Sequence, residues 1–191
     1  MPDHSRLKMS AANIIEAVGE DLDDPNFKET PNRFAKAFSF LFKNPKVIEL
    51  EVAEVMKTSF PTQYDGLIFC DGLEFTSFCP HHLLPIKYEV IIGYIPSEGM
   101  VIGASKLARV VELYCKRAML QEELTRTIAD TIEKYIKPAG VAILIIGYHD
   151  CMRIRGIQQR NARFKTSEMR GAFKTNTETR EEFFHLMAKG V

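Results

Sequence analysis

The sequence predicts an α+β domain in which helices pack on one face of a four-stranded antiparallel sheet. Apolar residues recur with helical spacing near both ends and in the middle of the chain, and they alternate as in strands over residues 66–96. A chain of 191 residues is long enough for one such domain with a core of its own. The predicted order is helices, two strands, two helices, two strands and a final helix.

The N-terminal part is expected to be helical. Ile14, Ile15 and Val18 recur with helical spacing. Thr30 and Pro31 predict the start of a second helix, with the threonine as N-cap and the proline at the first helical position. This part therefore reads as a helical appendage that precedes the sheet.

Residues 66–96 are expected to form two strands joined through the segment 79–85. In the second strand the apolar residues Ile86 and Tyr88 alternate with charged ones such as Lys87. This alternation predicts an antiparallel pair with one covered face.

Helical spacing returns over residues 105–137, where we expect two helices separated near residues 117–120. Residues 141–148 are apolar on both faces and therefore predict a central strand. A further strand around residues 164–173 and a helix over residues 177–188 complete the prediction.

The predicted sheet is small, and its open edges favour pairing with another subunit. We therefore expect the protein to associate with itself. The chain divides in this interpretation into an N-terminal helical region, 1–60, and a sheet-containing region, 61–191.

Composition excludes several partners. The chain has 25 basic and 25 acidic residues, so nothing global favours nucleic acid or a membrane surface, and an anion site must be built locally. The longest apolar run, 141–147, is too short for a bilayer, and the first residues lack the apolar core of a signal peptide. We expect a cytoplasmic protein with reduced cysteines, of which Cys70 and Cys115 read as buried core residues.

Cys79, His82 and Cys151 suggest a metal site. A cysteine and a histidine three residues apart can converge on one ion from a single turn, whereas the adjacent His81 is expected to point elsewhere. Three protein ligands are typical of a catalytic zinc site that leaves one position for water or substrate. A structural zinc site and a chain without metal remain the alternatives at this point.

The second cysteine of this set lies among groups that suit an anionic substrate. The alternation of a strand places His149, Cys151, Arg153 and Arg155 on one face. A metal ligand, a proton carrier and two cations would then face one substrate.

The chain resembles the GTP cyclohydrolase I family over about residues 30–184. Six motifs occur in the order typical of that family. They are Thr30-Pro-Asn-Arg33-Phe-Ala-Lys36, Cys79-Pro-His81-His82-Leu-Leu-Pro85, Gly93-Tyr-Ile-Pro96, Ile102-Gly-Ala-Ser105-Lys106-Leu-Ala-Arg109, Gln121-Glu122-Glu-Leu-Thr125 and His149-Asp-Cys151-Met-Arg-Ile-Arg155-Gly156.

The resemblance implies a tunnelling fold, in which subunits complete a barrel by oligomerisation, typically as a homodecamer with active sites at subunit interfaces. It also implies conversion of GTP to 7,8-dihydroneopterin triphosphate and formate. One zinc ion per subunit would serve this reaction, without an organic cofactor.

Residue roles follow from the same resemblance. Zinc would be held by Cys79, His82 and Cys151, and His149 would protonate the purine. The other positions that match the family are His81 and Ser105 near the triphosphate and ribose, Glu122 with Gln121 beside it for guanine, and Lys106, Arg109, Arg155, Arg33 and Lys36 for the triphosphate, the last two from a neighbouring subunit.

Two segments depart from the family pattern. Pro80 stands where a glutamate is usual, which stiffens the ligand loop, and residues 159–165 carry additional positive charge. The alternatives are therefore a related purine-nucleotide hydrolase that stops at the formamidopyrimidine, and a non-catalytic assembly that binds zinc or nucleotide.

Overall fold

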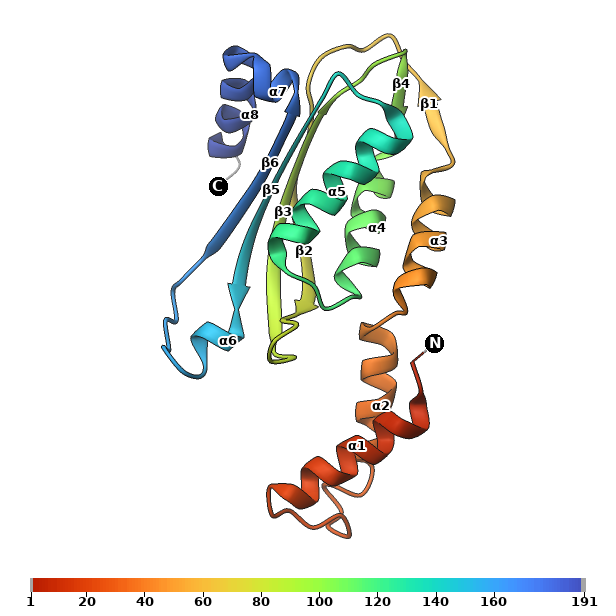
Figure 1. Cartoon of the computed structure of the whole chain (residues 1–191), viewed down its shortest axis with the longest axis vertical. Helices are drawn as coiled ribbons and strands as arrows, with labels where there is room; N and C mark the ends of the chain where they lie inside the picture. The colour runs from red at the N-terminus through yellow and green to blue at the C-terminus, as the bar shows by residue number, and fades with distance from the viewer. Residues whose placement is uncertain (1, 190–191) are drawn as a thin grey trace. The chain divides into compact units, whose positions relative to one another are not determined.

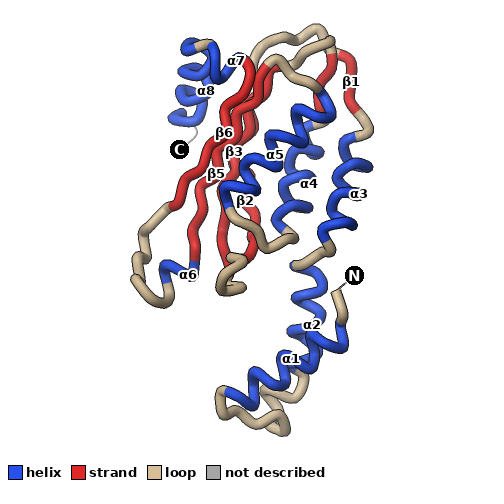
Figure 2. The backbone as a smooth tube through the Cα atoms, viewed as in Figure 1, coloured by secondary structure: helices blue, strands red, loops and turns tan. Residues whose placement is uncertain are grey.

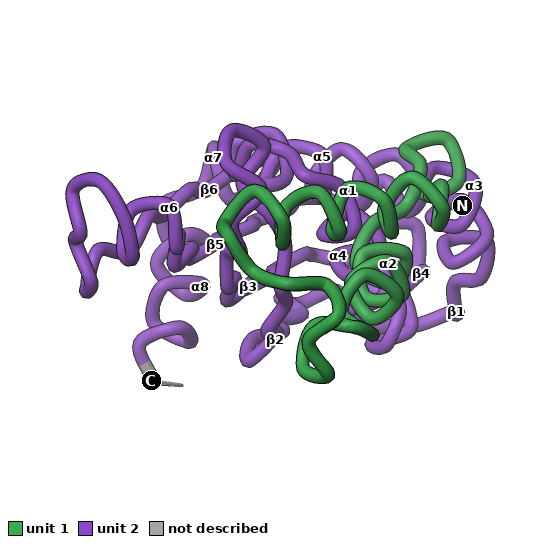
Figure 3. Tube along the Cα trace, turned by 90° about the horizontal axis from the view of Figure 1, so that it is seen from below, with its two compact units in different colours: residues 1–48 green, residues 49–191 purple. Residues whose placement is uncertain are grey.

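A computed structural model describes residues 2–189 of the chain. The chain divides into two compact units, Met1–Ile48 and Glu49–Val191, which Figure 3 shows in different colours. Each unit is described by itself below.

The first unit contains helices α1, His4–Ala17, and α2, Thr30–Leu41, which pack against each other. The carboxylate of Asp3 accepts a hydrogen bond from the backbone N–H of Arg6 at 3.0 Å and thereby caps α1. Because Ala11 and Ile15 lie one turn apart and are both buried, they form the inner face of α1.

The predicted N-cap of α2 is wrong by one residue. Glu29 occupies the cap position without a side-chain hydrogen bond, and Thr30 is already helical. The hydroxyl of Thr30 instead donates to the carbonyl of Asn26, because a preceding turn leaves that carbonyl within reach. Pro31 was expected at the first helical position and is the second helical residue, so it lies one position later but within the first turn.

Helix α3, Pro45–Met56, begins in the first unit and continues into the second. Asn44 accepts a hydrogen bond from the backbone N–H of Lys46 at 2.9 Å, next to the proline that opens the helix. Ile48, Val52 and Met56 recur every fourth residue and are buried.

The second unit is built on one antiparallel sheet with the strand order β2-β3-β5-β6 (Figures 1 and 2). The strands are β2, Ile68–Phe78, β3, Pro85–Ile95, β5, Gly140–His149, and β6, Phe164–Gly171. The α+β class, the antiparallel pairing of the two strands within residues 66–96 and the central position of β5 are confirmed. A separate two-stranded sheet of β1, Ser59–Pro61, and β4, Met100–Ile102, was not predicted.

One face of the sheet is covered by helices α4, Ala104–Cys115, and α5, Gln121–Ile136. These are the two helices predicted from the pattern, with the break between them at the expected place. A Cβ built on Gly147 would point at Gln121 of α5, so the odd-numbered side chains of β5 face these helices.

The opposite face of the sheet is covered by helices α7, Ala172–Thr175, and α8, Thr177–Lys189 (Figure 1). Phe183 of α8 packs with Ile91 and Leu144 in a buried cluster. The prediction that helices lie on one face only is therefore wrong. Because β5 is apolar on both faces, both faces need a cover.

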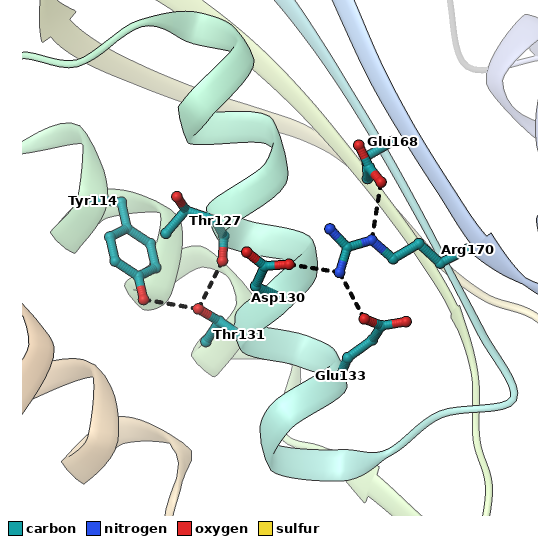
Figure 4. A network of polar contacts seen from close by, with 7 residues as sticks. All are labelled: Tyr114, Thr127, Asp130, Thr131, Glu133, Glu168 and Arg170. Atoms are coloured by element: carbon teal, nitrogen blue, oxygen red, sulfur yellow. Dashed lines mark hydrogen bonds and ion pairs between the residues drawn. The ribbon is translucent and has the colours of Figure 1, made fainter.

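Arg170 of β6 pairs with three carboxylates, two of which belong to α5 and connect that helix to the sheet (Figure 4). One nitrogen, Nη1, lies 2.7 Å from Asp130 and 2.6 Å from Glu133, and Nε lies 3.0 Å from Glu168. A guanidinium has several donors in fixed directions, so it can serve partners from two elements together.

No helix within residues 2–189 is both long and apolar enough to cross a membrane.

Candidate metal centre and adjoining pocket

Cys79, His82 and Cys151 come together at one end of the sheet, with their ligand atoms within 4.8 Å of one another. The turn between β2 and β3 places the first two. The backbone N–H of Leu83 donates to the carbonyl of Cys79 at 2.8 Å, and Leu83 has a φ of 51°. This tight reversal leaves Nδ1 of His82 3.6 Å from Sγ of Cys79, as the three-residue spacing predicted.

His81 does not point away from this group as expected. Its Nδ1 also lies 3.6 Å from Sγ of Cys79. The turn is tight enough that both neighbouring imidazoles approach the same sulfur, and the rings meet edge to face. His81 therefore lies directly beside the three candidate ligands.

Cys151 reaches the centre from a helical turn and not from a strand. β5 ends at His149, and α6, Asp150–Arg153, follows at once. The predicted alternation of His149, Cys151, Arg153 and Arg155 on one strand face is wrong for that reason. Asp150 pairs with Arg153 at 3.5 Å, which stabilises the turn locally.

The electrostatics of the two thiols suit a cation. Burial raises the pKa of the Cys151 thiol, and the adjacent Cys79 raises it further, while Arg155 acts in the opposite direction. Two neighbouring thiols resist ionising together unless a positive charge lies between them. Two sulfurs and one imidazole nitrogen fit a borderline-soft divalent ion such as zinc and leave a coordination position open.

A pocket of about 190 Å³ lies beside this centre. It is formed where the β2–β3 turn, the start of α5 and the end of β5 meet. Its lining includes Cys79, His81, Gln121, Glu122, His149 and Cys151.

His149 is half-buried in this pocket, where burial lowers its pKa and Glu122 partly offsets that effect. Its Nε2 lies 2.9 Å from Oε1 of Gln121. The ring also meets Tyr88 and Phe164 edge to face. The imidazole is thus fixed by one polar and two aromatic contacts.

Tyr88 packs against the ring of His149 and is fully buried. Its hydroxyl has no hydrogen-bond partner among residues 2–189. Burial raises its pKa, and the charges of Cys79 and Cys151 act on it in the same direction. A buried donor near two sulfurs is consistent with a site that is completed by an additional group.

Three residues expected at the site do not line this pocket: Ser105, Lys106 and Arg109 of α4. Ile86, which lines the pocket, and Tyr94 are separated by about 26 Å along β3 at the usual strand rise of roughly 3.3 Å. The hydroxyl of Tyr94 accepts a hydrogen bond from Ile102, just before α4 begins. Ser105 and Lys106 therefore lie near the far end of the sheet, where Nζ of Lys106 donates to the carbonyl of Val55 at 2.7 Å.

The remaining basic residues are placed differently. Arg33 and Lys36 are exposed on α2, in the first unit. Arg155 is exposed after α6, and its guanidinium contacts Nε2 of His82. Of the cations expected to bind phosphate, Arg155 is the one in direct contact with the candidate metal ligands.

Sequence reasoning missed Gly147 and Tyr88 as part of this site. A glycine inside a strand often marks a close approach by another group, and that signal was available for Gly147. The alternation of β3 marked Tyr88 as buried, but nothing in the pattern brings its ring against His149.

These features define an α+β protein with a candidate three-ligand metal centre beside a histidine-lined pocket. The chain belongs to the GTP cyclohydrolase I family, whose model matches residues 7–188.

Relatives match over nearly their whole length. "GTP cyclohydrolase 1" of Dehalococcoides mccartyi is 41% identical over 188 residues, which cover 98% of each chain. The protein of the same name from Thermoanaerobacter pseudethanolicus is 37% identical over 187 residues, again 98% of each chain. Among solved structures, the apo form of the archaeosine synthase QueF-Like is 19% identical, with a TM-score of 0.48 over 57% of this chain and 97% of its own.

Proposed function

We propose that the chain catalyses hydrolytic opening of the guanine imidazole ring of GTP, releases formate and forms 7,8-dihydroneopterin triphosphate. One observation carries the proposal: in a member of this family, three candidate metal ligands lie together, and two of them, Cys79 and Cys151, line one pocket with His149 and Glu122. We further propose that this occurs in the cytoplasm and supplies pterin biosynthesis.

Zinc would be held by Cys79, His82 and Cys151, whose donor atoms already lie within 4.8 Å of one another. When bound, zinc supplies Lewis-acid activation of water near neutral pH, which ring opening at C8 needs. His81, beside the same sulfur, is placed to contact the ribose or triphosphate.

His149 is the proton carrier in this proposal. Opening the ring leaves electron density on a purine nitrogen, and a positioned imidazole can deliver the proton that this nitrogen needs. His149 lines the pocket beside Cys151 and is held by Gln121, so its ring is oriented before substrate arrives.

Glu122 would recognise the base. Guanine presents adjacent N–H donors on its Watson–Crick edge, and one carboxylate can accept both. Glu122 lies in the first turn of α5 and lines the pocket. Gln121, the residue before it, is 2% exposed and uses its amide within the protein.

The triphosphate requires more cations than the pocket contains, so we propose that neighbouring subunits complete the site. None of Ser105, Lys106 and Arg109 lines the pocket of its own chain, and Ser105 and Lys106 lie near the far end of the sheet. Within the described residues, β2 and β6 each pair with a strand on one side only. Closure of these edges into a tunnelling-fold barrel, as a homodecamer, would bring Ser105, Lys106, Arg109, Arg33 and Lys36 to a partner's pocket.

Incubation of the zinc-loaded protein with GTP tests the proposal. We expect stoichiometric formate and a product that becomes a fluorescent pterin after oxidation, with no turnover by His149→Ala. A ring-opened product without formate would instead indicate a hydrolase that stops at the formamidopyrimidine. Unchanged GTP with fully loaded zinc would indicate a non-catalytic binding assembly.

A further inference from the structure

We infer that Gln121 keeps the side-chain proton of neutral His149 on Nε2, so that Nδ1 is the nitrogen that exchanges a proton with substrate. Gly147 leaves the space that the Gln121 side chain needs for this contact. Gln121 is thus a positioning residue and not a contact for guanine. The hydrogen-bond assignment stands on the structure, whereas its consequence for substrate rests on the function proposed above.

The orientation of the Gln121 amide is fixed by its surroundings. Its Nε2 lies 3.0 Å from the carbonyl oxygen of Ile145, 3.0 Å from that of Phe164 and 3.1 Å from Oγ1 of Thr166. Carbonyl oxygens only accept hydrogen bonds, so the NH2 group must face them. The oxygen, Oε1, must then face Nε2 of His149 at 2.9 Å.

Two hydroxyl groups close this network. The hydroxyl of Thr125 donates to the backbone carbonyl of Gln121 at 2.8 Å, which uses its one proton. Thr125 therefore accepts from Thr166 at 2.6 Å, and Thr166 accepts from the amide of Gln121. The two amide protons are shared among three acceptors, the carbonyls of Ile145 and Phe164 and the hydroxyl of Thr166. Reversing the amide would place Oε1 against two carbonyl oxygens.

Gly147 makes this arrangement possible. It lies two residues before His149, on the same face of β5. A Cβ at Gly147 would be 2.1 Å from Oε1 of Gln121 and 2.9 Å from Nε2 of His149. Any other residue at this position would force the buried amide or the imidazole to move.

The consequence concerns the two nitrogens of His149. Because Oε1 of Gln121 is an acceptor, Nε2 must carry the proton in the neutral ring. No group of the described chain forms a hydrogen bond with Nδ1, and the ring borders the pocket. Substrate therefore meets Nδ1, which can receive or give a proton without breaking the contact with Gln121.

The alternative role for Gln121, implied by family resemblance, is direct binding of guanine. For that role the amide would have to leave the two carbonyls, Thr166 and His149 together. A buried amide that leaves these partners without replacement loses roughly 1 kcal/mol for each hydrogen bond. Positioning of His149 is the role that retains every contact.

Solid-state NMR of the full-length, zinc-loaded protein with 15N-labelled histidine tests the assignment directly, with His149→Asn to identify the signals. At a pH where His149 is neutral, we expect a protonated Nε2, an unprotonated Nδ1 and a through-space contact from the Nε2 proton to the Gln121 amide. Protonation on Nδ1 would overturn the inference.

Variants separate positioning from substrate binding. Gln121→Met keeps the length of the side chain but removes the acceptor, and Gly147→Ala displaces the amide. We expect both variants to abolish the contact and populate both tautomers, with kcat lower by at least about tenfold and KM for GTP changed less than about twofold. Thr166→Val is the matched control, since it removes another partner of Gln121 and should leave the tautomer unchanged.

The outcomes are distinguishable from those for the proposed function. An unchanged tautomer in Gln121→Met, with KM raised about tenfold or more at constant kcat, would make Gln121 a substrate contact and overturn the inference. A protonated Nε2 in a protein that does not turn over GTP would reject the proposed function and support the hydrogen-bond assignment.

Discussion

Gly93 of β3 lies directly under the ring of Phe183 of α8: a Cβ on this glycine would be 2.7 Å from Cδ2 of the ring. Both residues are buried, and the contact fixes how closely the C-terminal helix approaches the sheet. We expect Gly93→Ala to lower the free energy of unfolding by about 1–3 kcal/mol, because the side chains around an overpacked site must move.

Chemical denaturation of the single and double variants measures this effect. In the double variant Gly93→Ala/Phe183→Leu the smaller side chain leaves room for the added methyl group. We therefore expect its loss of unfolding free energy to be smaller than the sum of the losses in the two single variants. Strict additivity of the two changes would argue against the steric explanation.

A second prediction separates the metal ligands from the proton carrier. Cys151→Ser removes one of three ligand atoms, so we expect loss of both bound zinc and turnover. His149→Ala leaves all three and should retain zinc while turnover is lost. Metal analysis and the formate assay on the same preparations provide the readout.

Cys70→Ser is the matched control, because Cys70 lies on β2 outside the cluster and should affect neither property. Equal loss of zinc in Cys151→Ser and His149→Ala would contradict the roles given to these two residues.

A third prediction concerns thiol reactivity. Burial raises the pKa of Cys115 to about 12, so this thiol should resist alkylation in the folded protein. Cys79 and Cys151 should be protected while zinc is bound and become reactive after chelation. Mass spectrometry of iodoacetamide-treated protein, with and without chelator, tests both statements.

The outcome for Cys151 decides the metal assignment. It is only partly buried, so geometry alone would leave it accessible. Equal labelling before and after chelation would mean that Cys151 holds no metal, whatever happens at Cys115.

Most of the fold could be predicted because periodicity reports burial directly. The alternation of Ile86 and Tyr88 with Lys87 identified β3, and the doubly apolar segment identified β5 as central. The packing of α7 and α8 on the second face of the sheet could not be predicted in this way. Phe183 is buried by contacts with strand residues far away in the sequence, such as Gly93 and Leu144, and no local pattern records those contacts.

The candidate site was predictable where its residues are close in sequence. The spacing of Cys79 and His82 reflects a single turn, and the structure places both beside Cys151. The helical turn after His149 was missed because four residues are too few to show a period. The positioning role of Gln121 depends on carbonyls from two strands, which no sequence pattern brings together.

A fourth prediction tests recognition of guanine. Glu122→Gln replaces one acceptor oxygen by a donor, so one of the two N–H groups of the base is left facing another N–H group. We expect kcat/KM for GTP to fall by roughly 10–100-fold, which corresponds to about 1–3 kcal/mol. Steady-state kinetics with Glu122→Gln and with the control Glu123→Gln, a neighbour that does not line the pocket, measure the difference.

Equal effects of the two substitutions would show that the charge at the start of α5 matters and not the specific contact, since both carboxylates lie in the first turn of that helix.

The last prediction concerns Arg170, whose side chain is 19% exposed while its carboxylate partners are 35–56% exposed. Arg170→Met keeps the apolar stem but removes the charge, and leaves Asp130, Glu133 and Glu168 close together without a cation. Because the partners are partly solvated, we expect a loss of about 1–3 kcal/mol in the free energy of unfolding. Arg170→Lys should recover only part of this loss, since one ammonium cannot match the directions of a guanidinium fork.

Denaturant titration at low and high salt measures the effect. The control is Arg126→Met, which changes an exposed residue of α5, the helix that carries Asp130 and Glu133. If Arg170→Met and Arg126→Met had equal effects, the network would contribute nothing specific to the attachment of α5 to β6.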